Sequence, residues 1–160
     1  MDENNATNDN NVITLQGTLS AGQIGGGSSG YDFVLYTEGT LQIPTNFFEG
    51  NTDMKSFASP SLNKRTVSSN AFKDCTNLVS AKFRIIDNWG TSVFNGCTAL
   101  KDIWLGTNKN NNGAFQFASD PYFPPSVTAI HVPSAYLNNY KNQSSLARYV
   151  DLIVGDYDIS

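Results

Sequence analysis

The sequence has few charged residues, few cysteines and no long hydrophobic run. Of its 160 residues only 15% are charged, the formal net charge is −4, and two residues are cysteines. This charge gives no general electrostatic attraction to nucleic acid or anionic lipid. Two cysteines are too few for a disulfide-built scaffold, and no apolar run approaches the roughly 20 residues of a membrane span. We therefore expect one domain, with no nucleic-acid partner and no membrane insertion.

Catalytic and metal-binding patterns are missing as well. His131 is the one histidine, and the sequence contains no motif of a serine hydrolase, a zinc peptidase or a phosphate-binding loop. The acidic residues are scattered and form no calcium-binding loop. We expect no catalytic residue, no metal, no cofactor and no enzymatic activity. A pair of carboxylates that meets only in space stays an open alternative, because such a pair leaves no mark in the sequence.

An internal repeat is the strongest pattern that is present. It is anchored by Phe48, Phe72 and Phe94, which are 24 and 22 positions apart. Around each phenylalanine the offsets −5, +3, +6, +9 and +11 form columns of mostly apolar residues: Ile43, Val67, Trp89; Asn51, Cys75, Cys97; Met54, Leu78, Leu100; Phe57, Ala81, Ile103; and Ser59, Phe83, Leu105. A degenerate fourth copy contains Phe115, then an insertion with "DPYFPP", then "VTAIHVP". Repeats of this length predict a solenoid of stacked coils.

Stacking makes each column an internal ladder. Because side chains alternate along a strand, the last two apolar positions of each copy face the core, and the short segment after each phenylalanine turns the chain as one helical or 3₁₀ turn. Phe72 should touch Phe94, and Cys75 should lie near Cys97. We interpret the two cysteines as small buried hydrophobic residues, and a disulfide between coils stays an alternative.

The segments "AFKDCTNLVSAKF" and "VFNGCTALKDIWL" resemble the BspA-type leucine-rich repeat of bacterial surface proteins, over roughly residues 41–133. The fold expected is α/β, a short leucine-rich-repeat solenoid of about three to four coils. Residues 1–11, rich in Asn, are expected to be a flexible tether. Residues 12–40 are expected to be an N-terminal β-hairpin cap, made of "VITLQGTL" and "YDFVLYT". Residues 134–160 are expected to form a C-terminal cap, with a helix that Ser134 caps followed by the strand "DLIV".

The exposed face of the repeat sheet is the surface on which we expect function. One outward-pointing residue from each coil should form a row: Ala58, Lys82, Trp104 and His131. An exposed Trp104 beside Lys82 is suited to anchor a protein or a sugar ring, and a cation–π contact between the two is expected. Asp102 and Arg84 lie next to this row and complete the candidate ligand-binding set. The alternative is that Trp104 packs under a loop such as "DPYFPP" and only stabilises the domain.

These features favour a non-catalytic binding module of a bacterial surface or secreted protein, with a protein or glycan partner. The localisation at the surface or outside the cell is expected if a signal segment has been removed. The alternative function is a structural, decoration or receptor-binding subunit of a virion, tail fibre or filament. Fold resemblance alone does not decide between them.

Overall fold

The computed structural model describes residues 6–9, 12–16, 31–36, 41–60, 62 and 65–159. These residues contain ten strands and three short helical segments. The strands are β1 (Ala6–Asp9), β2 (Val12–Gln16), β3 (Tyr31–Tyr36), β4 (Leu41–Ile43), β5 (Met54–Ser59), β6 (Arg65–Val67), β7 (Ser80–Trp89), β8 (Asp102–Asn108), β9 (Ala129–His131) and β10 (Ile153–Val154). The helical segments are the 3₁₀ helices η1 (Ser134–Tyr136) and η2 (Ser144–Leu152), with the α-helix α1 (Leu137–Lys141) between them.

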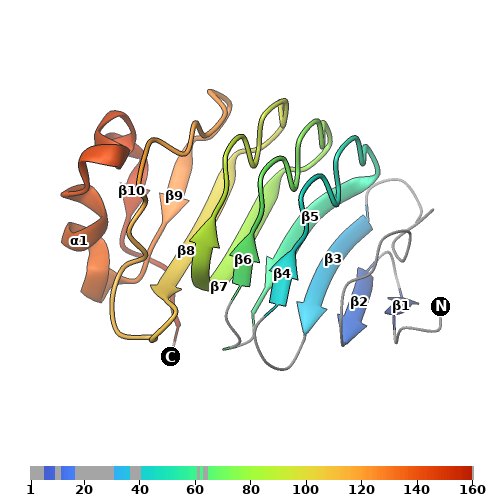
Figure 1. Ribbon diagram of the computed structural model, residues 1–160, viewed down its shortest axis with the longest axis horizontal. Coiled ribbons are helices and arrows are strands. Elements are labelled where there is room, and N and C mark those ends of the chain that lie inside the picture. Colours follow the sequence, from blue (N-terminus) through green and yellow to red (C-terminus); the bar gives the residue numbers. More distant parts are fainter. Residues whose placement is uncertain are drawn as a thin grey trace.

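The strands form one long sheet in the order β1-β2-β3-β5-β7-β8-β9-β10. All neighbouring pairs from β2 to β10 are parallel, and only β1 and β2 are antiparallel. Figure 1 shows these strands side by side across the molecule, with the C-terminal helical segments at one end. A parallel sheet in which each coil contributes one strand is the geometry of a solenoid. The parallel sheet and the few helices therefore fit an α/β repeat fold.

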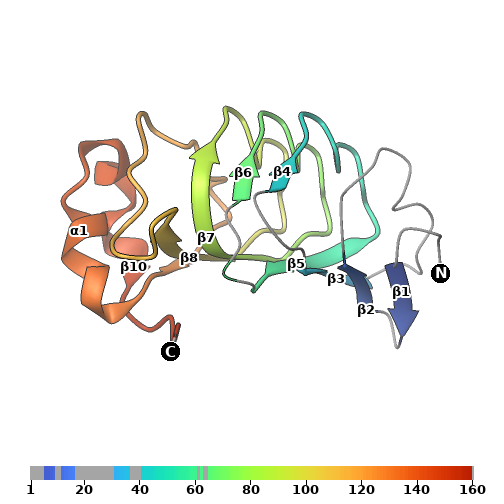
Figure 2. The same ribbon diagram turned by 60° about the horizontal axis from the view of Figure 1, so that its bottom comes forward.

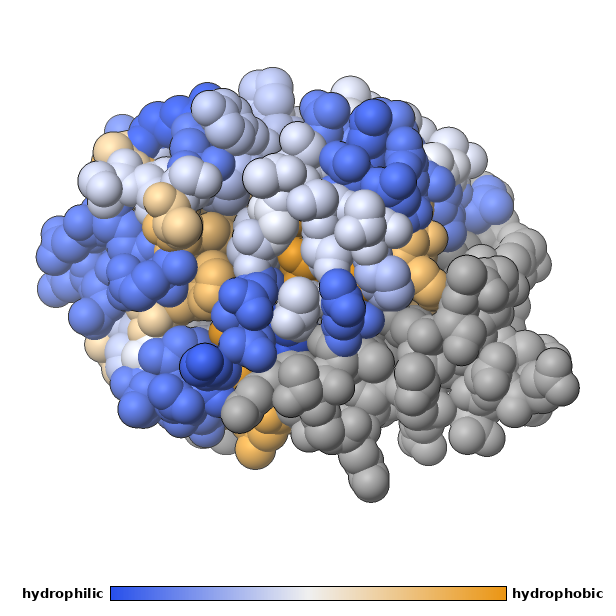
Figure 3. Space-filling view, viewed as in Figure 1, coloured by the Kyte–Doolittle hydropathy of each residue, from blue (hydrophilic) through white to orange (hydrophobic). Residues whose placement is uncertain are grey.

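A second, shorter set of strands forms another wall of the coils. Strand β4 pairs with β6, and β6 pairs with the second half of β7, whose first half pairs with β5 and β8. Figure 2 shows β4 and β6 across the coil from β5, so that the long strand β7 belongs to both walls. On the face seen in Figure 1, the hydrophobic residues form only small separate patches among hydrophilic ones over the described part of the chain (Figure 3).

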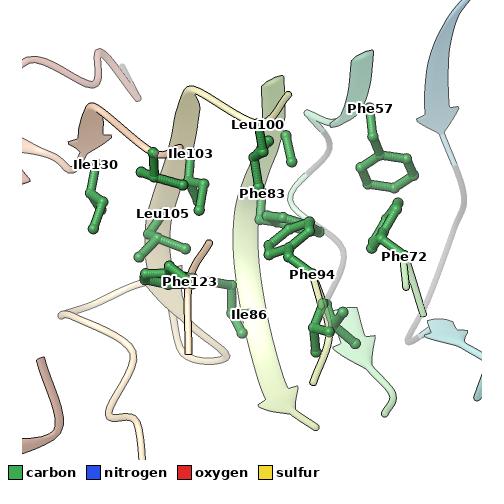
Figure 4. Close-up of a cluster of buried hydrophobic side chains, with 14 of the residues drawn as sticks. Phe57, Phe72, Phe83, Ile86, Phe94, Leu100, Ile103, Leu105, Phe123 and Ile130 are labelled. Atoms are coloured by element: carbon green, nitrogen blue, oxygen red, sulfur yellow. The ribbon is translucent and has the colours of Figure 1, made fainter. Parts of the chain in front are cut away.

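The phenylalanine column is confirmed as a ladder in the core. The Phe72 ring lies 5.2 Å from that of Phe48 and 5.4 Å from that of Phe94, centroid to centroid. Phe57 packs edge-on against Phe72 at 4.9 Å, and all four side chains are buried. Figure 4 shows the rings of Phe57, Phe72 and Phe94 in the core together with leucine and isoleucine side chains. The Phe72 ring therefore packs against the equivalent rings of the coils before and after it.

The turn after each phenylalanine is built from i to i+3 hydrogen bonds. The amide of Cys75 donates to the carbonyl of Phe72, and the amide of Leu78 donates to the carbonyl of Cys75. These bonds have the 3₁₀ pattern that was expected, although the segment is a series of turns rather than a helix. Left-handed backbone recurs at the same place in each coil, at Asn46, Asn70 and Ser92.

The cysteines are free and buried, as the ladder interpretation predicts, and the disulfide alternative is wrong. The Cys75 thiol donates to the carbonyl oxygen of Phe48 at 3.1 Å, and the Cys97 thiol donates to that of Phe72 at 2.9 Å. Each thiol thus satisfies a buried carbonyl of the preceding coil. The neighbouring Cys97 thiol and burial together raise the pKa of Cys75 well above its usual range.

Two expectations for the N-terminal part are wrong. Strands β2 and β3 pair in parallel, so they are not a hairpin. A parallel connection needs a crossover of about a dozen residues or more, and residues 17–30, which lie outside the described part, provide that length. Strand β1 pairs with β2 where a tether was expected, so Ala6–Asp9 belongs to the sheet. Residues 1–5 and 10–11 lie outside the described part.

The fourth copy and the C-terminal segment also differ in detail from expectation. The ring next to Phe94 along the ladder is Phe123, at 6.5 Å, whereas Phe115 packs against Phe117 at 4.9 Å. The insertion makes the chain of this coil longer, and Phe123 takes the ladder position in place of Phe115. At the C-terminal end, the N-cap position of η1 is occupied by Pro133 rather than Ser134, and it makes no side-chain capping hydrogen bond. The helical segments precede β10, which pairs with β9 in parallel.

Candidate functional site

The outward row on the main sheet forms in the predicted register. Ala58 is opposite Lys82, Lys82 is opposite Trp104, and Trp104 is opposite His131. The inward neighbours on these strands are fully buried, so alternation leaves the row on the outer face. We call Lys82, Trp104 and His131 the sheet-face row.

Trp104 is the centre of a stack of side chains within this row. Its ring lies parallel to that of His131, with the ring centroids 4.3 Å apart and the planes at 12°. The Lys82 ammonium lies 4.8 Å from the Trp104 ring, which confirms the expected cation–π contact. The indole is half-buried by these neighbours. The stack thus fixes the orientation of a large aromatic ring on the outer face.

His131 lies between two carboxylates. Its Nε2 atom lies 2.9 Å from Oδ1 of Asp102, and its Nδ1 atom lies 2.7 Å from Oδ1 of Asp156. Only 14% of its side chain is exposed, because the two carboxylates and the Trp104 ring surround the imidazole. Asp102 was predicted to belong to the site, whereas Asp156 was missed because it follows the last repeat and no period places it.

Arg84 is buried, contrary to its expected place on an open ligand-binding surface. Only 8% of it is exposed. Its guanidinium donates to Oγ1 of Thr107 at 3.1 Å and to the carbonyl of Ile159 at 3.3 Å. Arg84 therefore ties the C-terminal residues to the sheet and has little surface to offer a partner.

The residues after β10 run over part of this outer face. The amide of Tyr157 donates to the carbonyl of Val132, and the Tyr157 ring lies 5.8 Å from the Lys82 ammonium. Burial raises the pKa of Tyr157 to about 12, against the opposing effect of the Arg84 charge. Tyr157 was also missed by sequence reasoning, since nothing in "GDYDIS" indicates which face it covers.

The "DPYFPP" loop does not account for the burial of Trp104. Phe123 of this loop packs on Trp89 and Phe94 inside the coil, whereas Trp104 lies on the outer face of β8. The neighbours that cover Trp104 are Lys82 and His131. That the row binds a partner stays a prediction.

Other kinds of site find no support in the part of the chain that the structure describes. Within the ranges given above, no three His, Cys, Asp or Glu residues gather in a way that suits a metal ion. Over the same ranges, no helix has the length and apolarity needed to cross a membrane.

The profile of the BspA-type leucine-rich repeat region matches residues 32–142, in 6 copies. The chain belongs to this family. The match begins within β3 and extends into the C-terminal segment, and so it reaches beyond the range of about 41–133 that the resemblance suggested. Comparison with curated proteins and with solved structures gives no match. BspA-type repeat proteins are typically surface or secreted proteins of bacteria, and leucine-rich repeats are generally non-catalytic scaffolds for protein interactions.

Proposed function

We propose that this BspA-type chain is a non-catalytic binding module of a bacterial surface or secreted protein, which holds a protein or a glycan on the sheet-face row. The family supports the class of function, and the Trp104 stack supports the place. Aromatic residues held in a fixed orientation are over-represented among the residues that dominate binding energy. Fixing the ring before binding reduces the conformational entropy lost on association.

The charges around the row favour a partner with both apolar and polar groups. Lys82 presents a cation beside the indole, while Asp102 and Asp156 present carboxylates on either side of His131. A partner that lays an apolar or ring surface on Trp104 and brings hydrogen-bond donors to the two carboxylates fits this arrangement. A large hydrophobic partner surface does not fit, because charged groups surround the ring.

The test is a binding screen of the whole chain against extracellular matrix proteins and a glycan array, followed by variants. Trp104→Ala should lower the affinity for the partner identified in the screen by at least about tenfold, equivalent to ~1.4 kcal/mol. Trp104→Phe should restore part of the affinity. Val79→Ala truncates an exposed apolar side chain that lies outside the row and serves as the control.

A loss of stability without a loss of affinity would show that Trp104 has only a structural role. If Trp104→Ala lowers the melting temperature sharply while every affinity stays unchanged, the sheet-face row is not the binding site. The same conclusion follows if Val79→Ala abolishes binding of the partner and Trp104→Ala does not.

A further inference from the structure

A cavity of about 350 Å³ lies between the end of β7 and residues 115–122. It shares no lining residue with the sheet-face row. The segment between β8 and β9 that forms one wall runs beside β7 and the C-terminal helical segments in Figure 2. The cavity is lined by aromatic rings and by polar groups, which include Trp89, Phe115, Phe117, Tyr122, Asp87, Gln116 and Asp120. Its volume is in the range of small-molecule sites.

The wall formed by residues 115–122 is held by side chains of the C-terminal segments. Tyr140 accepts a hydrogen bond from the Phe115 amide at 3.1 Å and donates one to the carbonyl of Gly106 at 2.8 Å. Gln143 accepts from the Phe117 amide at 3.0 Å and donates to the carbonyl of Phe115 at 2.9 Å. These paired bonds satisfy the backbone of a segment that belongs to no sheet, so the cavity is preformed.

Tyr122 is presented at the edge of this wall. Its ring is 69% exposed, and its amide donates to Oδ1 of Asp120 at 2.8 Å. The Arg148 guanidinium lies 5.2 Å from the ring and also makes contacts of 2.6 Å and 3.3 Å with the Asp120 carboxylate. A large exposed ring is thus fixed at the rim, and a second hollow of about 330 Å³ adjoins it on the side of Phe94 and Arg148.

Trp89, which lines the cavity, also carries an unsatisfied donor. The indole Nε1 of Trp89 is buried and has no hydrogen-bond partner among the described residues. A buried N–H without an acceptor costs about 1–3 kcal/mol, and such groups are rare in native proteins. Nε1 is covered in the ligand-free chain, so a ligand oxygen reaches this N–H only when the indole turns toward the cavity, and the hydrogen bond then removes that cost.

We propose that the cavity beside Trp89 and Tyr122 binds the ring of a neutral sugar. Sugar hydroxyls both donate and accept hydrogen bonds, and so they match the Trp89 donor as well as the carboxylate and amide acceptors of the wall. The C–H groups on one face of a sugar ring are complementary to the negative face of an aromatic ring such as Tyr122. This inference concerns a different surface from the proposed function and does not depend on it.

The charges of the wall argue against ionic ligands. Asp87 and Asp120 line the cavity, and no Lys or Arg lines it within the part of the chain described by the structure. Their cationic partners, Lys109 and Arg148, contact these carboxylates from outside the lining. An anion would meet two carboxylates, whereas a cation would leave the Trp89 N–H without an acceptor.

Nuclear magnetic resonance of the whole ¹⁵N-labelled chain tests this proposal. The chain contains two tryptophans, and Trp104→Phe identifies which indole N–H signal belongs to Trp89. Methyl glycosides of glucose, galactose and mannose are titrated one at a time, with methyl glucuronide as the anionic counterpart. At least one neutral sugar should shift the Trp89 signal saturably, with a Kd on the order of 1 mM because the ligand is small, and the Trp104 signal should not move.

Two variants link such a shift to the cavity. Tyr122→Ala should weaken sugar binding by about tenfold, and its melting temperature should stay that of the unaltered chain because the ring is exposed. Trp89→Phe, which keeps an aromatic ring but removes the N–H, should weaken it as well, whereas Trp104→Phe should leave the affinity unchanged. The proposal is overturned if no neutral sugar shifts the Trp89 signal, if Tyr122→Ala binds as well as the unaltered chain, or if the glucuronide binds as tightly as the glucoside.

Discussion

Replacing Phe72 by alanine tests the ladder on which the fold depends. Phe72 is fully buried, and its ring lies 4.9 to 6.2 Å from four others, those of Phe48, Phe57, Phe83 and Phe94. Truncation of a buried phenylalanine to alanine costs about 3–5 kcal/mol in transfer free energy and cavity formation. The cost for Phe72 should lie at the upper end of this range, because each of the four aromatic pairs adds about 0.5–1.5 kcal/mol. We expect a loss of about 4–5 kcal/mol in the free energy of unfolding.

This loss is large relative to the 5–15 kcal/mol that stabilises a typical domain. For a chain of this size it corresponds to a fall of about 8–20 °C in melting temperature, since each kcal/mol shifts Tm by about 2–4 °C. Urea unfolding followed by circular dichroism measures it as a lower midpoint with an unchanged slope. Phe72→Leu, which keeps most of the volume, should lose about 1–2 kcal/mol and provides a measurable value if the alanine variant does not fold.

Phe47→Ala is the matched control for this experiment. Phe47 is the sequence neighbour of a ladder residue but is only half-buried, and its ring packs on that of Phe48 at a centroid distance of 4.8 Å. Its truncation should cost about 1–2 kcal/mol. The ladder argument is refuted if Phe72→Ala loses no more stability than Phe47→Ala.

Three further predictions concern the turns and the titrating groups. Cys75 should resist thiol reagents at pH 8 in the folded chain and react only on unfolding, because its pKa is raised; stoichiometric labelling of the native chain would contradict this. Gly96→Ala should cost about 2 kcal/mol in unfolding free energy, since Gly96 has φ of 81° and a Cβ there would meet Oδ1 of Asp74 at 2.0 Å. Gly50→Ala, where φ is 76° and the space is open, should cost only about 1 kcal/mol; equal losses would show that the contact with Asp74 relaxes freely. Asp120→Asn should lower stability at pH 7, and this loss should shrink as the pH falls below the ordinary carboxyl pKa of about 3.9 and through the lower folded value; a urea-unfolding series from pH 7 downward checks this, and a loss that does not change with pH would contradict it.

The sign of the Asp120 effect follows from the shift of its pKa. Burial acts to raise this pKa, but hydrogen bonds from the Tyr149 hydroxyl, the Tyr122 amide and Arg148 outweigh burial and lower it. The folded chain therefore binds the proton less tightly than the unfolded chain does. The stabilisation is present above the unfolded pKa of about 3.9 and is lost as the pH falls through the folded value.

The repeated part of the chain was predictable because its period fixes which residues of adjacent coils lie side by side and whether each side chain points inward or outward. Once Phe72 and Phe94 are aligned, the register of β7 and β8 and the outward place of Trp104 follow from alternation alone. The burial of the cysteines follows in the same way. No such rule reaches the segments outside the period: the direction of β2 depends on the path of residues 17–30, and the burial of Arg84 depends on the C-terminal residues that return to the sheet.

The period also limits where a specific site can form. The inward columns repeat the same residue types from coil to coil, as the phenylalanines and cysteines do. Their side chains are buried in the core and cannot contact a partner. Recognition needs groups that differ between coils and reach the surface. Two places meet this condition: the outward row, where Lys82, Trp104 and His131 differ at equivalent positions, and the insertion before β9, where Tyr122 and the wall around Trp89 have no counterpart in the other coils. Because the two places share no residue, Trp104→Ala and Tyr122→Ala should affect different ligands, and a ligand lost equally in both variants would show that they form one site.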